Sequence, residues 1–189
     1  MPDQSGSEKE IRTLGSRLVY ENRWMRLRED AIRRQDGSDG IYGVVEKPDF
    51  VLVIPVEADG AVHLVEQYRY PVGARFWEFP QGTWEGEPGA DPISIARGEL
   101  EEETGLVAAE MIHAGHLFQG YGFSTQGYHV FLARGLTPTA RRLDPEEQGL
   151  ISRRFPATEL ARMIREGEIK DASTVAAFGL VLLKGLYRP

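Results

Sequence analysis

Four carboxylates stand within five residues of this chain, in the stretch ELEEETG (Glu99–Gly105), and a glycine ends the run. Because helical residues are spaced by about 100°, Glu99, Glu102 and Glu103 share one face of a helix, and Glu101 lies opposite. Like charges at this spacing repel one another. The face is therefore either a solvated acidic surface or an oxygen-rich site for a hard divalent cation such as magnesium.

The acidic stretch falls at the end of a well-delimited helix. Asp91 is a favourable N-cap, and Pro92 follows at the first helical position. Gly105 provides the left-handed residue that commonly ends a helix. The sequence therefore predicts a helix that ends at about Thr104. Its apolar stripe, at positions i, i+3 and i+7, consists of Ile93, Ala96 and Leu100.

The rest of the chain alternates between strand and helix patterns. Residues 50–56 are apolar throughout, which predicts a strand buried on both faces, and Asp59-Gly60 predicts a hairpin to the next strand. Further strands are predicted at 17–21, 24–34, 40–46, 61–68, 112–118, 128–133 and 149–155, and helices at 157–166 and 172–186. This order predicts an α+β fold with a mixed β-sheet between helical layers, preceded by N-terminal antiparallel strands.

Composition and charge exclude several classes of protein. The net charge of −7 argues against nucleic acid or an anionic membrane as a partner, and the absence of cysteine excludes disulfides and thiolate chemistry. No apolar run reaches the roughly 18–20 residues of a membrane span, and the polar N-terminus has no signal-peptide core. We therefore expect a cytoplasmic protein, with residues 1–11 disordered and a single domain over residues 12–189.

The spacing of these residues resembles a known motif. Gly82, Glu99, Leu100, Glu102, Glu103, Gly105 and Leu106 together resemble the Nudix box, G-x5-E-x7-R-E-U-x-E-E-x-G-U, where U is a bulky apolar residue. Segments 65–69, 77–82 and 169–174 resemble those of the ADP-ribose pyrophosphatase branch of the Nudix hydrolases. The resemblance covers about residues 15–186 and implies a Nudix-type α/β/α sandwich.

Two parts of the box depart from the pattern. Gly98 stands where the box has its arginine, so the role of that arginine is either lost or taken by another side chain. The interval from Gly82 to Gly98 is two residues longer than in the pattern. The early box glutamate would then fall at Ala90, and Glu85 and Glu87 are candidate substitutes for it.

The resemblance implies an enzyme that uses water to hydrolyse the pyrophosphate of a nucleoside diphosphate linked to another group. Cations, Mg2+ or Mn2+, would neutralise the substrate and lower the pKa of the attacking water. By resemblance, Glu99, Glu103 and the backbone carbonyl of Gln81 are metal ligands, and Glu102 ligates a further metal or a metal-bound water.

The general base is open at this stage. The resemblance places it in a late loop, which makes Glu146 or Glu147 a candidate; Glu99 is the alternative, as in other Nudix branches. An ordinary exposed turn explains the acidic segment 144–148 about equally well.

Candidate substrate-binding residues also follow from the resemblance. Arg69 resembles an arginine that contacts phosphates, with a surface ion pair as the alternative. The glycine-rich loop 120–127 is expected to line the pocket with Tyr121, Phe123 and Ser124. Trp24 (or Trp77) is a candidate for stacking on a base, although core packing is the commoner role of tryptophan.

The substrate signals conflict. Tyr121 stands where ADP-ribose hydrolases carry a proline, and a tyrosine there is associated with dinucleoside polyphosphate hydrolases. The rest of the chain favours a nucleoside diphosphate sugar, first ADP-ribose, which would give AMP and ribose 5-phosphate. The alternatives are a dinucleoside polyphosphate hydrolase and a catalytically inactive Nudix-fold module that binds nucleotides or regulates a partner.

Two further expectations concern residues outside the box. Asp171 is predicted as the N-cap of the last helix. The four histidines (His63, His113, His116 and His129) lack a metal-ligand pattern in the sequence and are interpreted as structural. The resemblance also implies a homodimer to which the N-terminal strands, residues 12–46, contribute.

Overall fold

The computed structural model describes residues 10–83, 89–140 and 149–188. It forms two compact units, an N-terminal unit (Met1–Pro48 with Gly120–Gln126) and a larger unit (Asp49–Gln119 with Gly127–Pro189). The predicted disorder of residues 1–11 falls mostly outside the described residues, although strand β1 begins at Ile11. The single domain expected over residues 12–189 stays a prediction.

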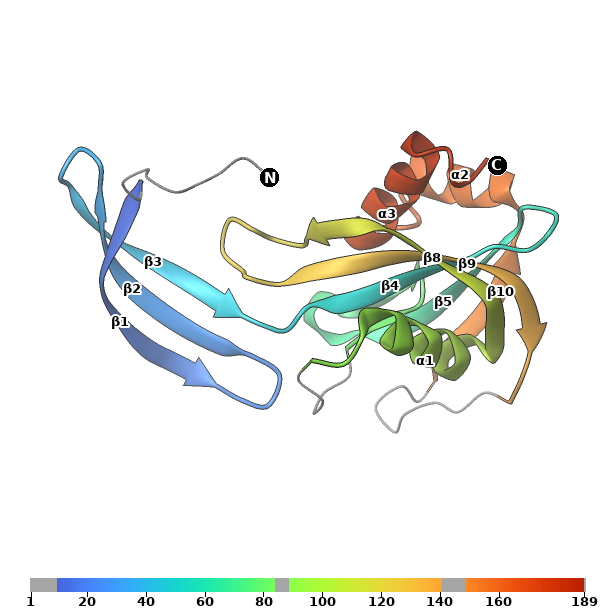
Figure 1. The fold of residues 1–189 in the computed structure, drawn as a ribbon, viewed down its shortest axis with the longest axis horizontal. Coiled ribbons are helices and arrows are strands. Elements are labelled where there is room, and N and C mark those ends of the chain that lie inside the picture. Colours follow the sequence, from blue (N-terminus) through green and yellow to red (C-terminus); the bar gives the residue numbers. More distant parts are fainter. Residues whose placement is uncertain (1–9, 84–88, 141–148, 189) are drawn as a thin grey trace. The chain divides into compact units, whose positions relative to one another are not determined.

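The N-terminal unit is an antiparallel sheet of three strands in the order β1-β2-β3 (Figure 1). The strands are β1 (Ile11–Glu21), β2 (Arg26–Arg34) and β3 (Asp39–Glu46). The Gly120–Gln126 segment lies alongside β3 and pairs with it. The carbonyl of Val45 accepts from the amide of Thr125 at 3.0 Å, and the amide of Val45 donates to the carbonyl of Phe123 at 2.8 Å. The predicted antiparallel N-terminal strands are confirmed, with Trp24 before β2 rather than in it.

The larger unit contains a mixed four-stranded sheet in the order β7-β4-β9-β8. Strand β4 runs parallel to β9 and antiparallel to β7, and β8 runs antiparallel to β9. A second, antiparallel sheet has the order β10-β5-β6. The strands are β4 (Phe50–Pro55), β5 (Val62–Arg69), β6 (Ala74–Glu78), β7 (Gln81–Gly82), β8 (Leu106–Phe118), β9 (Gly127–Pro138) and β10 (Ile151–Phe155), with a 3-10 turn η1 (Tyr70–Val72) after β5.

Helices cover both faces of the mixed sheet (Figure 1). Helix α1 (Pro92–Thr104) packs on one face with Ala96 and Leu100, and α2 (Ala157–Arg165) and α3 (Ala172–Leu183) pack on the other. Strand β4 contributes alternate residues to the two cores, which explains its continuous apolar sequence. The α+β sandwich with helical layers on both sides of a mixed sheet is thereby confirmed.

The predicted caps of α1 are present. The Asp91 carboxylate accepts from the amide of Ile93 at 3.3 Å, and Gly105 has φ +70° and donates its amide to Glu101. These local signals set the helix ends. Strand β8 then starts immediately after the cap, six residues earlier than the predicted strand 112–118.

The predicted hairpin between the strands at 50–56 and 61–68 is wrong. The turn itself forms, with Gly60 at φ +84° and its amide bonded to Glu57. However, β4 and β5 belong to different sheets and share only one bridge, between Val56 and Val62. Strand β9 instead pairs along the whole of β4 on one edge, and β7 pairs with Val51 and Leu52 on the other.

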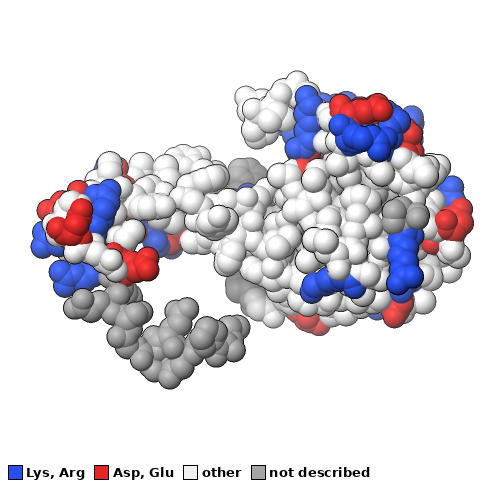
Figure 2. Space-filling model, turned by 90° about the horizontal axis from the view of Figure 1, so that it is seen from above, with Lys and Arg blue, Asp and Glu red and all other residues white. Residues whose placement is uncertain are grey.

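Charged side chains of both signs are interspersed on the face drawn in Figure 2. Helix α2 shows the pattern in detail, since Arg162 pairs with Glu159 at 2.6 Å and with Glu168 at 2.5 Å. Exposed pairs of this kind contribute little to stability, about 0–1 kcal/mol each. The fold therefore depends on its two apolar cores.

Replacement of Leu100 by alanine should destabilise the protein, because Leu100 is fully buried between α1 and the sheet. We expect Leu100→Ala to lower the free energy of unfolding by about 2–5 kcal/mol. Leu183→Ala is the matched control, because that leucine is 90% exposed at the end of α3. Urea unfolding measures both, and equal losses in the two variants would contradict the described core.

Candidate active site

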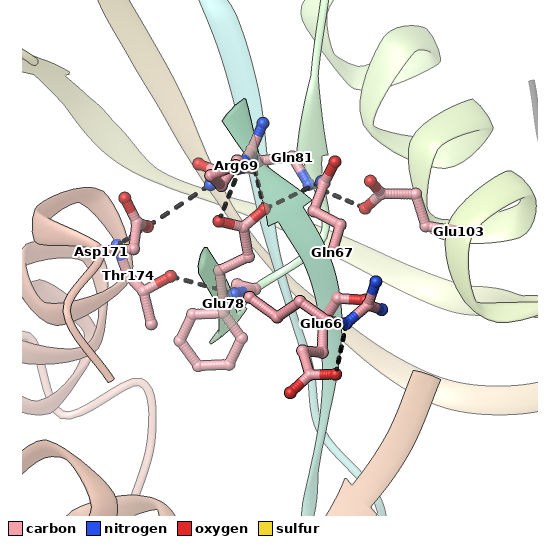
Figure 3. A network of polar contacts seen from close by, with 10 residues as sticks. Glu66, Gln67, Arg69, Glu78, Gln81, Glu103, Asp171 and Thr174 are labelled. Atoms are coloured by element: carbon pink, nitrogen blue, oxygen red, sulfur yellow. Dashed lines mark hydrogen bonds and ion pairs between the residues drawn. The ribbon is translucent and has the colours of Figure 1, made fainter. Parts of the chain in front are cut away.

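The acidic face of α1 packs against the short strand β7. Glu99 and Glu103 are only 7% and 1% exposed, so the face is not a solvated surface. A Cβ atom on Gly82 would come within 2.5 Å of the Glu99 carboxylate oxygens, so only glycine leaves room for this side chain. The amide of Gln81 donates to Oε2 of Glu103 at 3.0 Å (Figure 3). The box glycine and two box glutamates thus form one contiguous site.

A third buried carboxylate, that of Glu78, holds Arg69. Glu78 is 2% exposed and accepts from Nε of Arg69 at 3.2 Å, from Arg69 Nη2, and from Gln67 Nε2 at 3.0 Å (Figure 3). Burial raises the pKa of Glu78, Arg69 lowers it, and the charge of Asp171 raises it again. Arg69, at the end of β5, is therefore bound to a buried carboxylate. This contact differs from an ordinary ion pair on the surface.

The start of α3 fixes the segment between β6 and β7. The hydroxyl of Thr174 accepts from the amide of Phe79 at 3.0 Å, and Asp171 accepts from Gln81 Nε2 at 3.4 Å. Asp171 also accepts from the amide of Thr174 at 2.7 Å, so the predicted N-cap is confirmed. One carboxylate thereby caps α3 and contacts the segment that faces the acidic helix (Figure 3).

The donor set fits a hard divalent cation. Buried carboxylates are costly unless they are compensated, and here two of them lie one helical turn apart. Carboxylate and carbonyl oxygens are the ligands that magnesium takes in proteins, with water and substrate phosphates completing its coordination. Glu99 and Glu103, with Glu102 half-buried beside them, are the residues that would hold such an ion.

The described hydrogen bond of Arg97 goes to strand β8, so this contact does not take over the role of the missing box arginine. The guanidinium of Arg97 donates to the carbonyl oxygen of Ala108 on β8 at 2.8 Å. Arg97 therefore anchors α1 to the neighbouring strand.

The predicted site residues fall into three groups. Gln81, Glu99 and Glu103 come together directly, and Arg69 joins them through the segment that begins at Glu78. Trp24, Tyr121, Phe123 and Ser124 belong to the N-terminal unit, where Tyr121 is 84% exposed. Outside the described residues lie Glu85, Glu87, Glu146 and Glu147.

The two tryptophans considered for stacking differ in environment. The guanidinium of Arg23 lies 4.1 Å from the centre of the half-exposed Trp24 ring. Trp77 instead packs edge-on against Phe155 at 4.8 Å, next to the core. Trp77 thus has the commoner, structural role.

The interpretation of the four histidines as structural stays a prediction, but two of them lie in a cluster that could hold a metal ion. Ligand atoms of Asp49, His116 and His129 all lie within 4.8 Å of one another. The sequence signal was weak, because the three residues come from different parts of the chain. Glu78 was also missed as a site residue; its only signal is a glutamate between the aromatic residues Trp77 and Phe79.

A separate hollow of about 550 Å3 lies beyond the end of β4, with Glu57, Arg134 and Tyr187 among its lining residues. No predicted site residue is among the described residues that line it. The candidate site is therefore defined by its chemistry and not by the size of a cavity.

Comparison with known proteins gives the family. Residues 11–45 match the nucleoside diphosphate sugar hydrolase N-terminal domain, and residues 46–178 match the NUDIX domain. The chain is 32% identical over 173 residues to an ADP-ribose pyrophosphatase of Mycobacterium tuberculosis, covering 90% of this chain and 82% of that protein. It is 31% identical over 171 residues to a methanol dehydrogenase activator of Bacillus methanolicus, covering 89% of this chain and 90% of that protein.

A solved structure supports the fold. The crystal structure of an ADP compounds hydrolase superposes with a TM-score of 0.82 at 21% identity, covering 96% of this chain and 98% of that chain. The sandwich and the acidic helix define a Nudix pyrophosphohydrolase. The chain belongs to the Nudix family, as its box residues predicted, and this family generally uses divalent metal ions.

Within the described residues, no helix is long and apolar enough to span a membrane.

Neutralising Glu78 should change how stability depends on pH. Because the pKa of Glu78 is raised in the folded protein, the folded state retains a proton that the unfolded state loses near its ordinary pKa of about 4.3. The contribution of Glu78 to the free energy of unfolding is thus complete below that pKa, and it declines as pH rises through the folded-state pKa. The stability of the wild type relative to Glu78→Gln should therefore decrease over this interval. Urea unfolding at a series of pH values checks this, and an increase would contradict it.

Proposed function

We propose that this protein hydrolyses ADP-ribose to AMP and ribose 5-phosphate with Mg2+ or Mn2+ as cofactor. The observation that carries the proposal is the buried pair Glu99 and Glu103 against Gln81 and Gly82, a donor set suited to such ions. The choice of substrate is supported by the similarity to the ADP-ribose pyrophosphatase of M. tuberculosis and by the match to the nucleoside diphosphate sugar hydrolase N-terminal domain.

The roles of the residues follow from their chemistry. Glu99, Glu103 and the carbonyl of Gln81 would hold the cation, and Glu102 would ligate a further ion or a bound water. The cation supplies positive charge to the pyrophosphate and lowers the pKa of the attacking water. Arg69, oriented by the buried Glu78, donates to phosphate oxygens with its forked guanidinium.

The base and the nucleoside contacts come from other parts of the chain in this proposal. Glu146 or Glu147 accepts the proton of the attacking water, with Glu99 as the alternative base. Trp24, Tyr121, Phe123 and Ser124 bind the nucleoside, since aromatic side chains stack favourably on bases. The strong exposure of Tyr121 and Phe123, 84% and 61%, supports this because both rings are accessible to a ligand.

Two other functions have a specific observation in their favour. The similarity to the methanol dehydrogenase activator of B. methanolicus favours a role as an activator of another enzyme. Tyr121 favours a dinucleoside polyphosphate as substrate. A panel of ADP-ribose, other sugar nucleotides, dinucleoside polyphosphates, NADH and nucleoside triphosphates, with products identified, separates these functions.

Removing one carboxylate charge from the acidic face should abolish hydrolysis. We expect Glu103→Gln to lower kcat/KM for ADP-ribose by about 100-fold or more, since even indirect ligand partners cost 10–100-fold. Glu101→Gln is the matched control, because it removes the same charge from the opposite face of α1 and should leave the rate within about two-fold of the wild type. Formation of AMP in magnesium, followed by chromatography, measures both variants.

Thermal melting in the absence of metal should show that both variants are folded. A Glu103→Gln enzyme that is folded and as active as the wild type would refute the assignment of the acidic face.

We also propose a homodimer formed through the N-terminal strands. The support is the exposure of large apolar side chains on β1 and β3, where Tyr20 is 51% and Ile41 is 69% exposed. Their partners on β2, Leu27 and Ala31, are four residues apart, so both side chains lie on one face of the sheet. Exposed apolar side chains gathered on a small sheet are typical of an interaction surface.

Replacing apolar residues of this surface by glutamate should dissociate the dimer. Sedimentation at micromolar concentration should give a dimer for the wild type and a monomer for the double variant Tyr20→Glu/Ile41→Glu. Leu183→Glu, at a leucine of the larger unit that is 90% exposed, should remain dimeric. A monomeric wild type would end the proposal.

A further inference from the structure

Three strands of the larger unit bring two imidazoles and a carboxylate together, on residues that have no role in the proposed reaction. Asp49 immediately precedes β4, His129 lies on β9 and His116 lies on β8. Their ligand atoms are all within 4.8 Å of one another, and the rings of His116 and His129 are 4.8 Å apart. We call Asp49, His116 and His129 the histidine site.

Strand register explains why these side chains meet. His116 and His129 are direct cross-strand partners in the antiparallel pair β8–β9. A register shift between His113 and Gly115 places one extra residue in β8, so His113 and His116 both face the same side of the sheet as Phe131 and His129. Without that bulge, residues three apart would point to opposite faces.

The surrounding contacts orient the histidine site. Oδ1 of Asp49 accepts from the amide of Gly127 at 2.8 Å, and Oδ2 lies 2.8 Å from Nε2 of His116. Nδ1 of His129 lies 3.2 Å from Nε2 of His113. Asp49 and His129 thus each have a further partner outside the site, the usual arrangement at metal sites, where such a partner fixes the orientation of a histidine or carboxylate.

Glycine provides the space for one ligand. A Cβ atom on Gly127 would lie 2.4 Å from Nε2 of His116, so the imidazole occupies the volume that any other side chain would fill. The absence of a side chain at this position therefore lets the ring reach Asp49 and His129.

The histidine site is separate from the acidic face of α1. Gly82, Val51, His129 and His116 are successive partners across β7, β4, β9 and β8. Adjacent strands are about 4.8 Å apart, so His129 lies roughly 10 Å and His116 roughly 14 Å from the glycine that contacts Glu99. One ion cannot be shared between the two sites.

We propose that Asp49, His116 and His129 bind a divalent transition metal ion of the zinc type. Two imidazoles and one carboxylate are borderline ligands that suit Zn2+, Co2+, Ni2+ or Cu2+, whereas Mg2+ prefers oxygen alone. Such an ion connects β4, β9 and β8 at one end of the sheet and stabilises the folded state by binding to it.

Calorimetry of the metal-free full-length protein tests the proposal. Zn2+ is titrated in excess Mg2+, which competes for the acidic face, and we expect one ion per chain. His116→Ala, His129→Ala and Asp49→Asn should each weaken binding by about 10-fold or more. His63→Ala is the matched control, because that histidine pairs with Glu57 elsewhere, and Glu103→Gln should also retain this zinc. Retention in Glu103→Gln keeps this test independent of the proposed hydrolysis.

Two further measurements guard against loss of folding. Co2+ should give visible absorption bands in the wild type that are lost in His116→Ala and His129→Ala, while melting without metal stays unchanged. Gly127→Ala leaves every ligand in place but displaces His116, and should also weaken zinc binding. Equal zinc affinity in the wild type, His116→Ala and His129→Ala, or no zinc bound in excess Mg2+, would overturn the proposal and leave an ordinary hydrogen-bonded cluster.

Discussion

The burial of Glu99 and Glu103 against β7 is the constraint on which the rest of the larger unit depends. Two carboxylates of the same helix face are withdrawn from water, which is unfavourable unless hydrogen bonds or a cation compensate them. The protein supplies part of this compensation with the amide of Gln81 and makes room with Gly82. Leu100 follows Glu99 directly and packs into the core, so the position of the acidic face is coupled to the packing of α1.

The segment from Glu78 to Gly82 distributes that constraint through the fold. Within a few residues it contacts the arginine of β5, the N-terminal turn of α3 and the acidic face of α1. These contacts use the carboxylate of Glu78 and the backbone amides of Phe79 and Gln81, so three different elements hold one short segment. A shift of this segment would therefore move Arg69 and the carboxylates together. This coupling explains why residues far apart in the sequence serve one site.

Sequence signals were reliable where they are local. The ends of α1 were predictable because the Asp91 cap and the Gly105 conformation involve only neighbouring residues. The burial of β4 on both faces was predictable because an unbroken apolar strand has no polar face to expose. The hairpin prediction failed although its turn formed, since the partners of β4 are decided by contacts between distant segments, here with β9 and β7. The residues at 85, 87, 146 and 147 lie outside the described part of the chain, so their proposed roles stay predictions.

The sequence by itself determined the family, the acidic helix, its caps and the identity of the box carboxylates, because these depend on residue types at fixed short spacing. Only the tertiary structure decided that Glu78 holds Arg69, that Asp171 contacts Gln81 as well as capping α3, and that a bulge in β8 turns His113 and His116 to the face of His129. The physical reason is that strand register and side-chain burial are set by contacts between distant segments. A one-residue shift in register reverses the face of every side chain in a strand, and no local pattern reports it.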